Sequence, residues 1–127
     1  MKVLIVEDEL EIGTVLTEFL EEEGFEVQTV PNGQAALTML GQEQGYVVLL
    51  DVMMPILDGY GVIESLRKDH RLDYHQIILM SAADRQARAR ALLQAGMIAA
   101  YIAKPFEIER LLALVKQSAA KLARVKG

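Results

Sequence analysis

Short hydrophobic stretches alternate with longer amphipathic ones along this chain of 127 residues, and this alternation constrains the fold most strongly. Four of the short stretches are almost continuously apolar, which is typical of strands covered on both faces of a parallel sheet. A fifth alternates apolar and polar residues, which suits a strand at the edge of the sheet. The strands are predicted at residues 3–6, 25–30, 46–50, 77–80 and 98–102.

An amphipathic helix is predicted after each strand. In the first of these, Ile12, Val15, Leu16 and Phe19 recur at the spacing of one helical stripe. Polar residues suited to N-capping precede the second, third and fourth helices: Asn32, Asp58 and Asp84. Glycines suited to ending the first and fourth helices are Gly24 and Gly96.

A strand followed by a helix, five times over, predicts right-handed crossovers with helices on both faces of a parallel sheet. We therefore predict an α/β fold, a flavodoxin-like (βα)5 doubly wound sandwich with strand order 2-1-3-4-5. The chain is expected to form a single domain over residues 1–127. The short remainder after Lys104 leaves no room for a helix-turn-helix, so we expect no output domain in this chain.

Composition excludes several classes of protein. Hydrophobic residues make up 52% of the chain, which is too many for a disordered segment. The chain has no cysteine and therefore no disulfide or thiol nucleophile. No stretch approaches the roughly 20 apolar residues of a membrane span, and the N-terminus lacks the features of a signal peptide. The net charge of −5 disfavours direct binding to nucleic acid. We expect a cytoplasmic domain.

Charged and polar residues follow four of the strands at their carboxyl ends. Glu7 and Asp8 follow the first strand, Asp51 the third, Ser81 the fourth and Lys104 the fifth. In an open parallel sheet these ends meet at one edge, where ligands bind. A single acid there is more often structural, for example at the start of the next helix. Five such groups on four strand ends instead indicate a site.

The residue types at this edge favour phosphoryl chemistry. Three carboxylates close together repel one another unless a cation neutralises them, and oxygen-only ligands select a hard ion such as Mg²⁺. An ammonium group and a hydroxyl can hold the oxygens of a phosphoryl group. The set predicts phosphoryl transfer to a carboxylate, which would give an aspartyl phosphate.

Over essentially its whole length, the chain resembles the receiver domain of two-component response regulators. The matching segments, in order, are VLIVEDE, VVLLDVMMPILDGY, IILMSA and YIAKPF. The resemblance implies that Asp51 is the phosphoacceptor. It also implies that Asp8 and Asp51 bind Mg²⁺, that Glu7 acts mostly through water, and that the backbone carbonyl of Met53 completes the protein's share of the metal ligands.

The same resemblance assigns roles to the last two strands. Ser81 would turn toward the phosphoryl group, Lys104 would pair with it, and Tyr101 would change rotamer when Ser81 moves. Lys104 and Pro105 would be joined by a cis peptide bond. The chain departs from the family between Gly96 and Tyr101, where it has four residues in place of the usual three.

Partners and regulation also follow from the resemblance. A histidine kinase or a phosphotransfer protein would donate the phosphoryl group. A downstream protein would dock on the face formed by the fourth helix, fifth strand and fifth helix, and the chain could also dimerise. The family places Met53 and Ala83 beside the path of the hydrolytic water, which neither side chain can orient, so slow loss of phosphate is expected.

Three other functions compete with this one. A phosphatase with an aspartate nucleophile needs a second acid two residues later, where this chain has Met53. A flavin mononucleotide binder needs a phosphate loop after the first strand, where this chain has acids. A pseudo-receiver, a protein-interaction module that is never phosphorylated, stays open. We expect no enzymatic activity beyond the protein's own phosphorylation and dephosphorylation. His70 and His75 are expected in solvated loops, away from the site.

Overall fold

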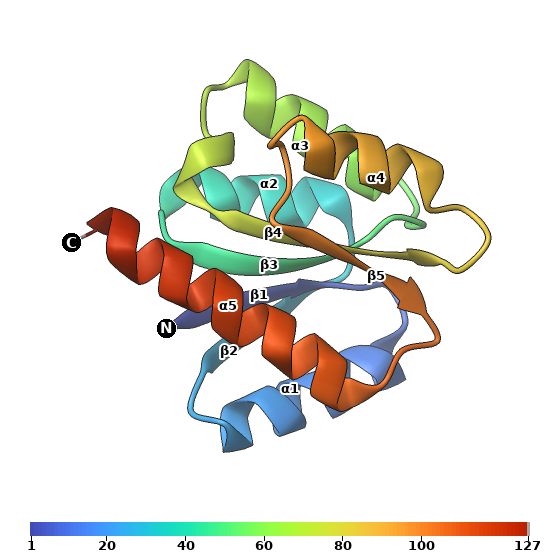
Figure 1. Ribbon diagram of the computed structural model, residues 1–127, viewed down its shortest axis with the longest axis vertical. Helices are drawn as coiled ribbons and strands as arrows, with labels where there is room; N and C mark the ends of the chain where they lie inside the picture. The colour runs from blue at the N-terminus through green and yellow to red at the C-terminus, as the bar shows by residue number, and fades with distance from the viewer. Residues whose placement is uncertain (127) are drawn as a thin grey trace.

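Five parallel strands form one sheet in the order β2-β1-β3-β4-β5, as predicted (Figure 1). The computed structural model describes residues 1–126, so Gly127, the last residue of the predicted domain, lies outside the described residues. The strands are β1 (Lys2–Val6), β2 (Glu26–Val30), β3 (Tyr46–Asp51), β4 (Gln76–Ala82) and β5 (Ala100–Lys104). The flavodoxin-like fold is therefore confirmed.

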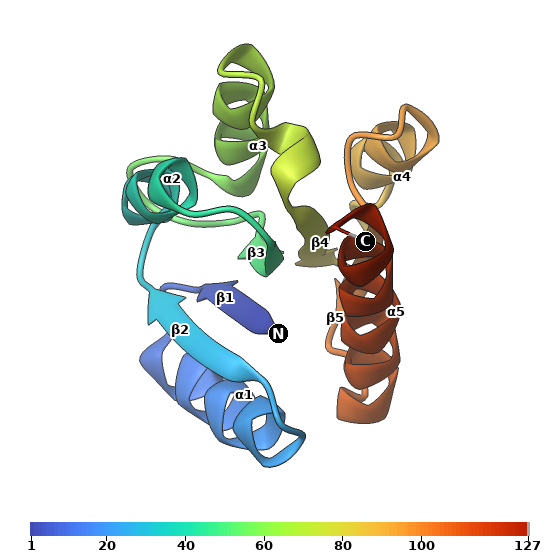
Figure 2. The same cartoon turned by 90° about the vertical axis from the view of Figure 1, so that its left-hand side faces the viewer.

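Helices cover both faces of the sheet, so the molecule has three layers. One face is covered by α1 and α5 and the other by α2, α3 and α4 (Figures 1 and 2). The helices are α1 (Leu10–Glu22), α2 (Gly33–Gln42), α3 (Gly59–Lys68), α4 (Ala87–Gln94) and α5 (Ile108–Lys126), with a short 3₁₀ helix at Leu72–Tyr74. Within residues 1–126, no helix combines the length and hydrophobicity needed to cross a membrane.

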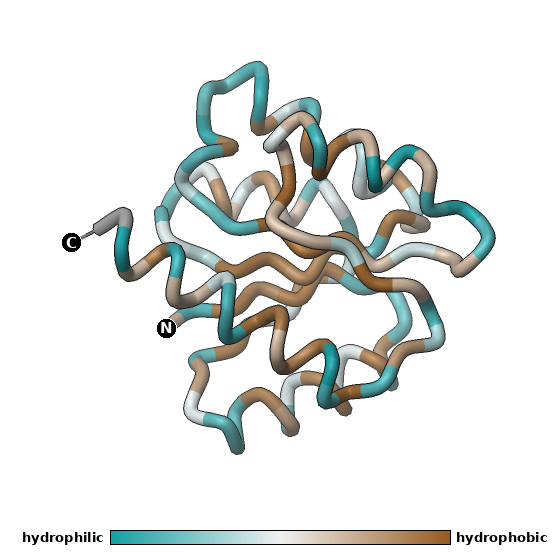
Figure 3. The backbone as a smooth tube through the Cα atoms, in the orientation of Figure 1, coloured by the Kyte–Doolittle hydropathy of each residue, from teal (hydrophilic) through white to brown (hydrophobic). Residues whose placement is uncertain are grey.

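The strands alternate their side chains between two hydrophobic cores. On β1, Val3 and Ile5 face α1 and α5, whereas Leu4 and Val6 face the other helix layer. The hydrophobic stretches accordingly run through the middle of the molecule (Figure 3). Among the strands within residues 1–126, only β2 is largely exposed, which fits its alternating pattern and its place at the sheet edge. The central strands thus form a rigid support for the residues at their ends.

Two predicted N-caps and a predicted helix end are confirmed. The Asn32 side chain accepts a hydrogen bond from the backbone N–H of Ala35 at 2.9 Å, at the start of α2. Asp58 accepts one from Gly61 at 2.8 Å, at the start of α3. Gly24 follows the end of α1 with a φ of 95°, a conformation that glycine adopts without steric cost.

The predicted N-cap of α4 is wrong. This helix begins at Ala87, and the N-cap position is held by Gln86, not Asp84. The backbone N–H of Arg85 donates to the carbonyl of Ala82 at 3.0 Å, so a turn separates β4 from the helix. Asp84 lies exposed within this turn, too early in the chain to reach the first N–H groups of α4.

The fifth strand lies two residues later than predicted. Ile98 is buried, but it lies in the loop before β5. The neighbouring Met97 N–H donates to the carbonyl of Leu92 at 3.0 Å and so closes the end of α4. The prediction started the strand too early because Ile98 is apolar and buried although it lies in the loop. It ended the strand too early because Lys104, the last residue of β5, is polar.

The expectation for His75 is also wrong, because this residue is only 3% exposed. Its Nδ1 atom accepts a hydrogen bond from the backbone N–H of Tyr46 at 3.1 Å, and its Nε2 atom lies 3.2 Å from the carbonyl of Leu40. A carbonyl only accepts, so Nε2 carries the proton and the ring is neutral. His75 thus joins the end of α2 to the start of β3. His70 is exposed, as expected.

Candidate functional site

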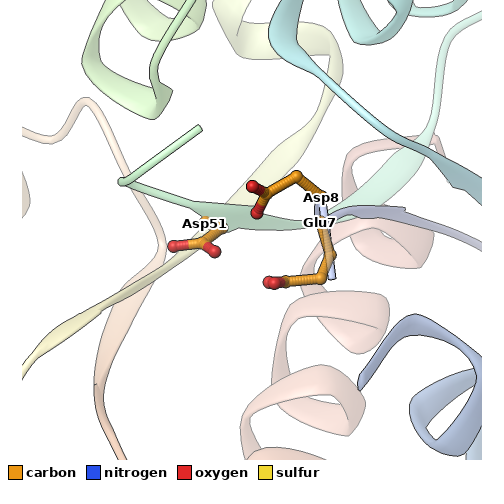
Figure 4. Close-up of side chains that lie close together, drawn as sticks. All are labelled: Glu7, Asp8 and Asp51. Atoms are coloured by element: carbon orange, nitrogen blue, oxygen red, sulfur yellow. The ribbon is translucent and has the colours of Figure 1, made fainter. Parts of the chain in front are cut away.

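The carboxyl ends of β1 and β3 bring three carboxylates together. Val6 pairs with Leu50 across these neighbouring strands, so the residues that follow emerge side by side. The three residues are Glu7, Asp8 and Asp51 (Figure 4). Each has a carboxylate oxygen that lies within 4.8 Å of a carboxylate oxygen of the other two. Glu7 and Asp51 are buried, whereas Asp8 is exposed. The predicted acidic cluster is therefore present and open to solvent on the Asp8 side.

Lys104, at the end of β5, reaches across β4 into this cluster. Its ammonium nitrogen Nζ lies 2.9 Å from Oδ2 of Asp51 and 3.2 Å from Oε2 of Glu7. The remaining oxygens of these carboxylates are held by the backbone. The N–H of Met53 donates to Oδ1 of Asp51 at 3.1 Å, and the N–H of Glu9 donates to Oε1 of Glu7 at 3.3 Å.

The cluster holds three carboxyl groups and a single ammonium group, so its positive charge is smaller than its possible negative charge. Burial raises the pKa of Glu7 to about 7, and the hydrogen bond and negative charge of Asp51 add to this rise, while Lys104 opposes it. Burial lowers the pKa of Lys104, but Asp51 and Glu7 raise it by more, so the pKa lies above its usual value. One ammonium faces three acids, and the donors are all oxygen, which fits a hard divalent cation such as Mg²⁺.

Ser81 lies beside the cluster at the end of β4, whereas Tyr101 lies three residues before Lys104 on β5. Ser81 is buried at the end of β4, and its Oγ accepts a hydrogen bond from Nε2 of Gln86 at 2.6 Å. In the part of the chain that the structure describes, no hydrogen bond links Ser81 to the carboxylates. Tyr101 is half-buried on β5, opposite Leu79 of β4. The peptide bond between Lys104 and Pro105 is cis, as the resemblance implied.

Two residues important to the local structure were missed in the sequence. A Cβ atom on Gly59 would lie only 2.7 Å from the carbonyl oxygen of Asp51 and 3.0 Å from Cα of Val52. Only glycine therefore lets α3 start against the backbone of Asp51. The sequence signal was the Asp58–Gly59 pair, because an Asp-Gly pair marks a turn and Asp58 caps the helix that follows. Gln86 is the second, and its contact with Ser81 across a turn leaves no pattern in the sequence.

Comparison with known proteins identifies relatives that match nearly the whole chain. A family profile described as "Response regulator receiver domain" matches residues 3–116. Among curated proteins, the probable transcriptional regulator ycf27 of Cyanophora paradoxa is 39% identical over 115 residues, which are 91% of this chain and 46% of that protein. The regulatory protein VanRc of Enterococcus gallinarum is 32% identical over 91% of this chain and 48% of its own length. The chain thus spans about half the length of these relatives.

Solved structures give the same result. The receiver domain of the Francisella response regulator 1452 superposes with a TM-score of 0.84 at 29% identity, covering 94% of this chain and 97% of that one. The response regulator TrrA of Thermotoga maritima, solved in complex with Mg²⁺ and BeF, is 33% identical with a TM-score of 0.75, covering 91% and 96% of the two chains.

Proposed function

Because the chain belongs to the response regulator receiver domain family, we propose that it is a phosphorylatable switch with Asp51 as the phosphoacceptor. The observation that carries this proposal is the contact of the Lys104 ammonium with both buried carboxylates, Asp51 and Glu7, beside the exposed Asp8. Such a cluster gives a carboxylate nucleophile a positive neighbour and an opening to solvent. The expected cytoplasmic location and the extent of a single domain over residues 1–127 are part of this proposal.

The cluster would hold Mg²⁺ through oxygen atoms. Asp8 and Asp51 are the proposed direct ligands, with Glu7 acting mostly through water and Met53 through its backbone carbonyl. The ion, when bound, would supply positive charge that neutralises phosphoryl oxygens. The TrrA structure, solved with Mg²⁺ and BeF, supports this assignment in a relative.

The chemistry of the transfer assigns a role to each side chain. A carboxylate oxygen of Asp51 forms the new P–O bond while the P–N bond of a donor phosphohistidine breaks, and the departing imidazole takes up a proton. Lys104 transfers its contact from the Asp51 carboxylate to a phosphoryl oxygen, and Ser81 donates its hydroxyl hydrogen to another. Tyr101 adjusts its rotamer to the position of Ser81. The protein catalyses only its own phosphorylation and dephosphorylation.

A groove beside Lys104 is the proposed docking site for the phosphodonor, a histidine kinase or a phosphotransfer protein. The groove lies between α1 and the start of α5, and it is mostly apolar. Its lining includes Ile12, Val15, Leu16, Pro105 and Phe106, together with Lys104 itself. Val15 is 58% exposed, which is unusual for a residue on the apolar stripe of a helix. A partner helix seated there would lie beside Lys104, which contacts Asp51.

The output face is proposed on α4, β5 and α5. Strand β5 is an edge of the sheet and carries Tyr101, so a change in this side chain would alter that surface. Exposed Arg88 and Arg90 on α4 would suit a partner with acidic groups. A second copy of the chain would be an alternative occupant.

Beryllofluoride, a mimic of the phosphoryl group, tests the proposal against a pseudo-receiver. We expect it to raise the midpoint of thermal unfolding only when Mg²⁺ is present, because a ligand that binds the folded state stabilises it. The Asp51→Asn variant should lose this rise. Asp73→Asn, an exposed acid at the opposite end of the sheet, should keep it. A pseudo-receiver would show no rise in any of the three proteins.

The lifetime of the phosphorylated form is expected to be long. Neither Met53, which is 68% exposed beside Asp51, nor the exposed Ala83 offers a polar group to orient a hydrolytic water. Met53→Asn and Ala83→Glu should therefore each speed the loss of phosphate several-fold. The check is the decay of the phosphorylated protein followed by intact mass. Faster decay in the unaltered protein than in both variants would contradict this expectation.

A further inference from the structure

We propose that Gln86 is a positioning residue that holds the Ser81 hydroxyl in its resting place until Asp51 is phosphorylated. The inference rests on the proposed function, in which Ser81 turns toward the phosphoryl group. Its basis is a pair of hydrogen bonds from one amide nitrogen: Nε2 of Gln86 lies 2.6 Å from Oγ of Ser81 and 2.7 Å from the carbonyl oxygen of Ala82.

These two contacts fix the direction of the hydrogen bond to Ser81. A backbone carbonyl can only accept, so the atom facing Ala82 must be the NH₂ group of the Gln86 amide. The same nitrogen then donates its other hydrogen to Ser81. The hydroxyl oxygen accepts, and its own hydrogen stays available for another acceptor. Gln86 therefore restrains Ser81 without using the hydrogen that the phosphoryl group would need.

The burial of Ser81 determines how much the hydrogen bond from Gln86 stabilises its resting position. Ser81 is only 3% exposed, so its oxygen has little access to water if Gln86 is lost. The Gln86 side chain is half-buried and can reach solvent when Ser81 leaves it. Removing the amide thus destabilises the resting position of Ser81 more than the turned position, which shifts the balance toward the latter.

The contact also links Ser81 to the output face. Gln86 occupies the N-cap position of α4, and its carbonyl accepts a hydrogen bond from the N–H of Arg90 at 2.9 Å. In the same first turn of α4, the guanidinium of Arg88 lies 3.9 Å from the ring centre of Tyr60 on α3. Movement of Ser81 would release Gln86 and so loosen one of the contacts that hold the start of α4.

A double-mutant cycle tests the inference through the affinity for beryllofluoride in the presence of Mg²⁺. Gln86→Leu should bind it about 2- to 10-fold more tightly than the unaltered protein, the range that corresponds to one net hydrogen bond. In a Ser81→Ala background, the same substitution should have no effect, because the acceptor is already absent. Gln94→Leu, an exposed glutamine at the other end of α4, is the matched control and should bind normally.

The side-chain amide signals of Gln86 in the NMR spectrum test the bond without phosphoryl chemistry. One of the two amide protons should move on Ser81→Ala, while the signals of Gln94 stay in place. Equal tightening by Gln86→Leu in both backgrounds, or no tightening in either, would overturn the inference. Failure of the unaltered protein to bind beryllofluoride would instead contradict the proposed function, and the amide signals would still decide whether Gln86 holds Ser81.

Discussion

Replacing Lys104 by methionine is expected to slow the phosphorylation of Asp51 by a small phosphodonor by about 10²-fold or more, the usual cost of losing one group that stabilises charge in a transition state. The ammonium lies 2.9 Å from Asp51, so it is placed to meet the oxygens of an incoming phosphoryl group. Methionine keeps the length and much of the apolar stem of lysine but carries no charge. The rate of adduct formation, followed by intact mass, measures the effect.

Lys116→Met is the matched control for this variant. Lys116 forms an exposed ion pair with Glu23 on the α5 side of the molecule, at 3.5 Å. An exposed pair contributes little to stability, so this substitution should leave both the fold and the phosphorylation rate unchanged. A Lys104→Met protein that reacts as fast as the Lys116→Met protein would show that the ammonium has no part in the transfer.

The second large effect is expected at His75, far from the site. The His75→Leu variant would leave the Tyr46 N–H and the Leu40 carbonyl in the interior without the ring that bonds to both. This loss should lower the free energy of unfolding by about 2–4 kcal/mol. His70→Asn should change it by less than about 0.5 kcal/mol, because His70 is exposed. Denaturant unfolding measures both. Equal stability of the two variants would mean that the buried ring is dispensable.

We also expect His75 to make the free energy of unfolding depend on pH. Burial lowers the pKa of His75 below its usual value of 6.5, so below that pH the unfolded chain binds a proton that the folded chain excludes. The contribution of His75 is therefore complete above about pH 6.5 and is lost as the pH falls, by at most about 1.4 kcal/mol per pH unit. The raised pKa of Glu7 acts in the opposite direction between pH 4.5 and 7. The difference between the unaltered protein and His75→Leu isolates the histidine, and a difference independent of pH would contradict this account.

The sequence was sufficient to predict the sheet order and the meeting of Glu7, Asp8, Asp51 and Lys104. Each of these residues ends a strand or lies within two residues of its end, and parallel pairing brings strand ends to one edge of the sheet regardless of the loop conformations. The N-caps Asn32 and Asp58 were predicted for a similar reason, because a cap bonds to a backbone group only a few residues away.

The failures share a different cause: each depends on contacts that are distant in the sequence or hidden in a loop. His75 binds groups 29 and 35 residues away, so nothing near it shows that it is buried. Asp84 looked like a cap, but a turn after Ala82 delays the start of α4. Gln86 combines both difficulties, since its role depends on how that turn folds back onto Ser81.

The most direct test of the central claim is the intact mass of the protein after incubation with acetyl phosphate, with and without Mg²⁺, for the unaltered chain and Asp51→Asn. We predict a single phosphoryl adduct on the unaltered protein that requires Mg²⁺ and is missing from the variant. An adduct that persists in Asp51→Asn, or no adduct on the unaltered protein under either condition, would contradict the assignment of Asp51 as phosphoacceptor.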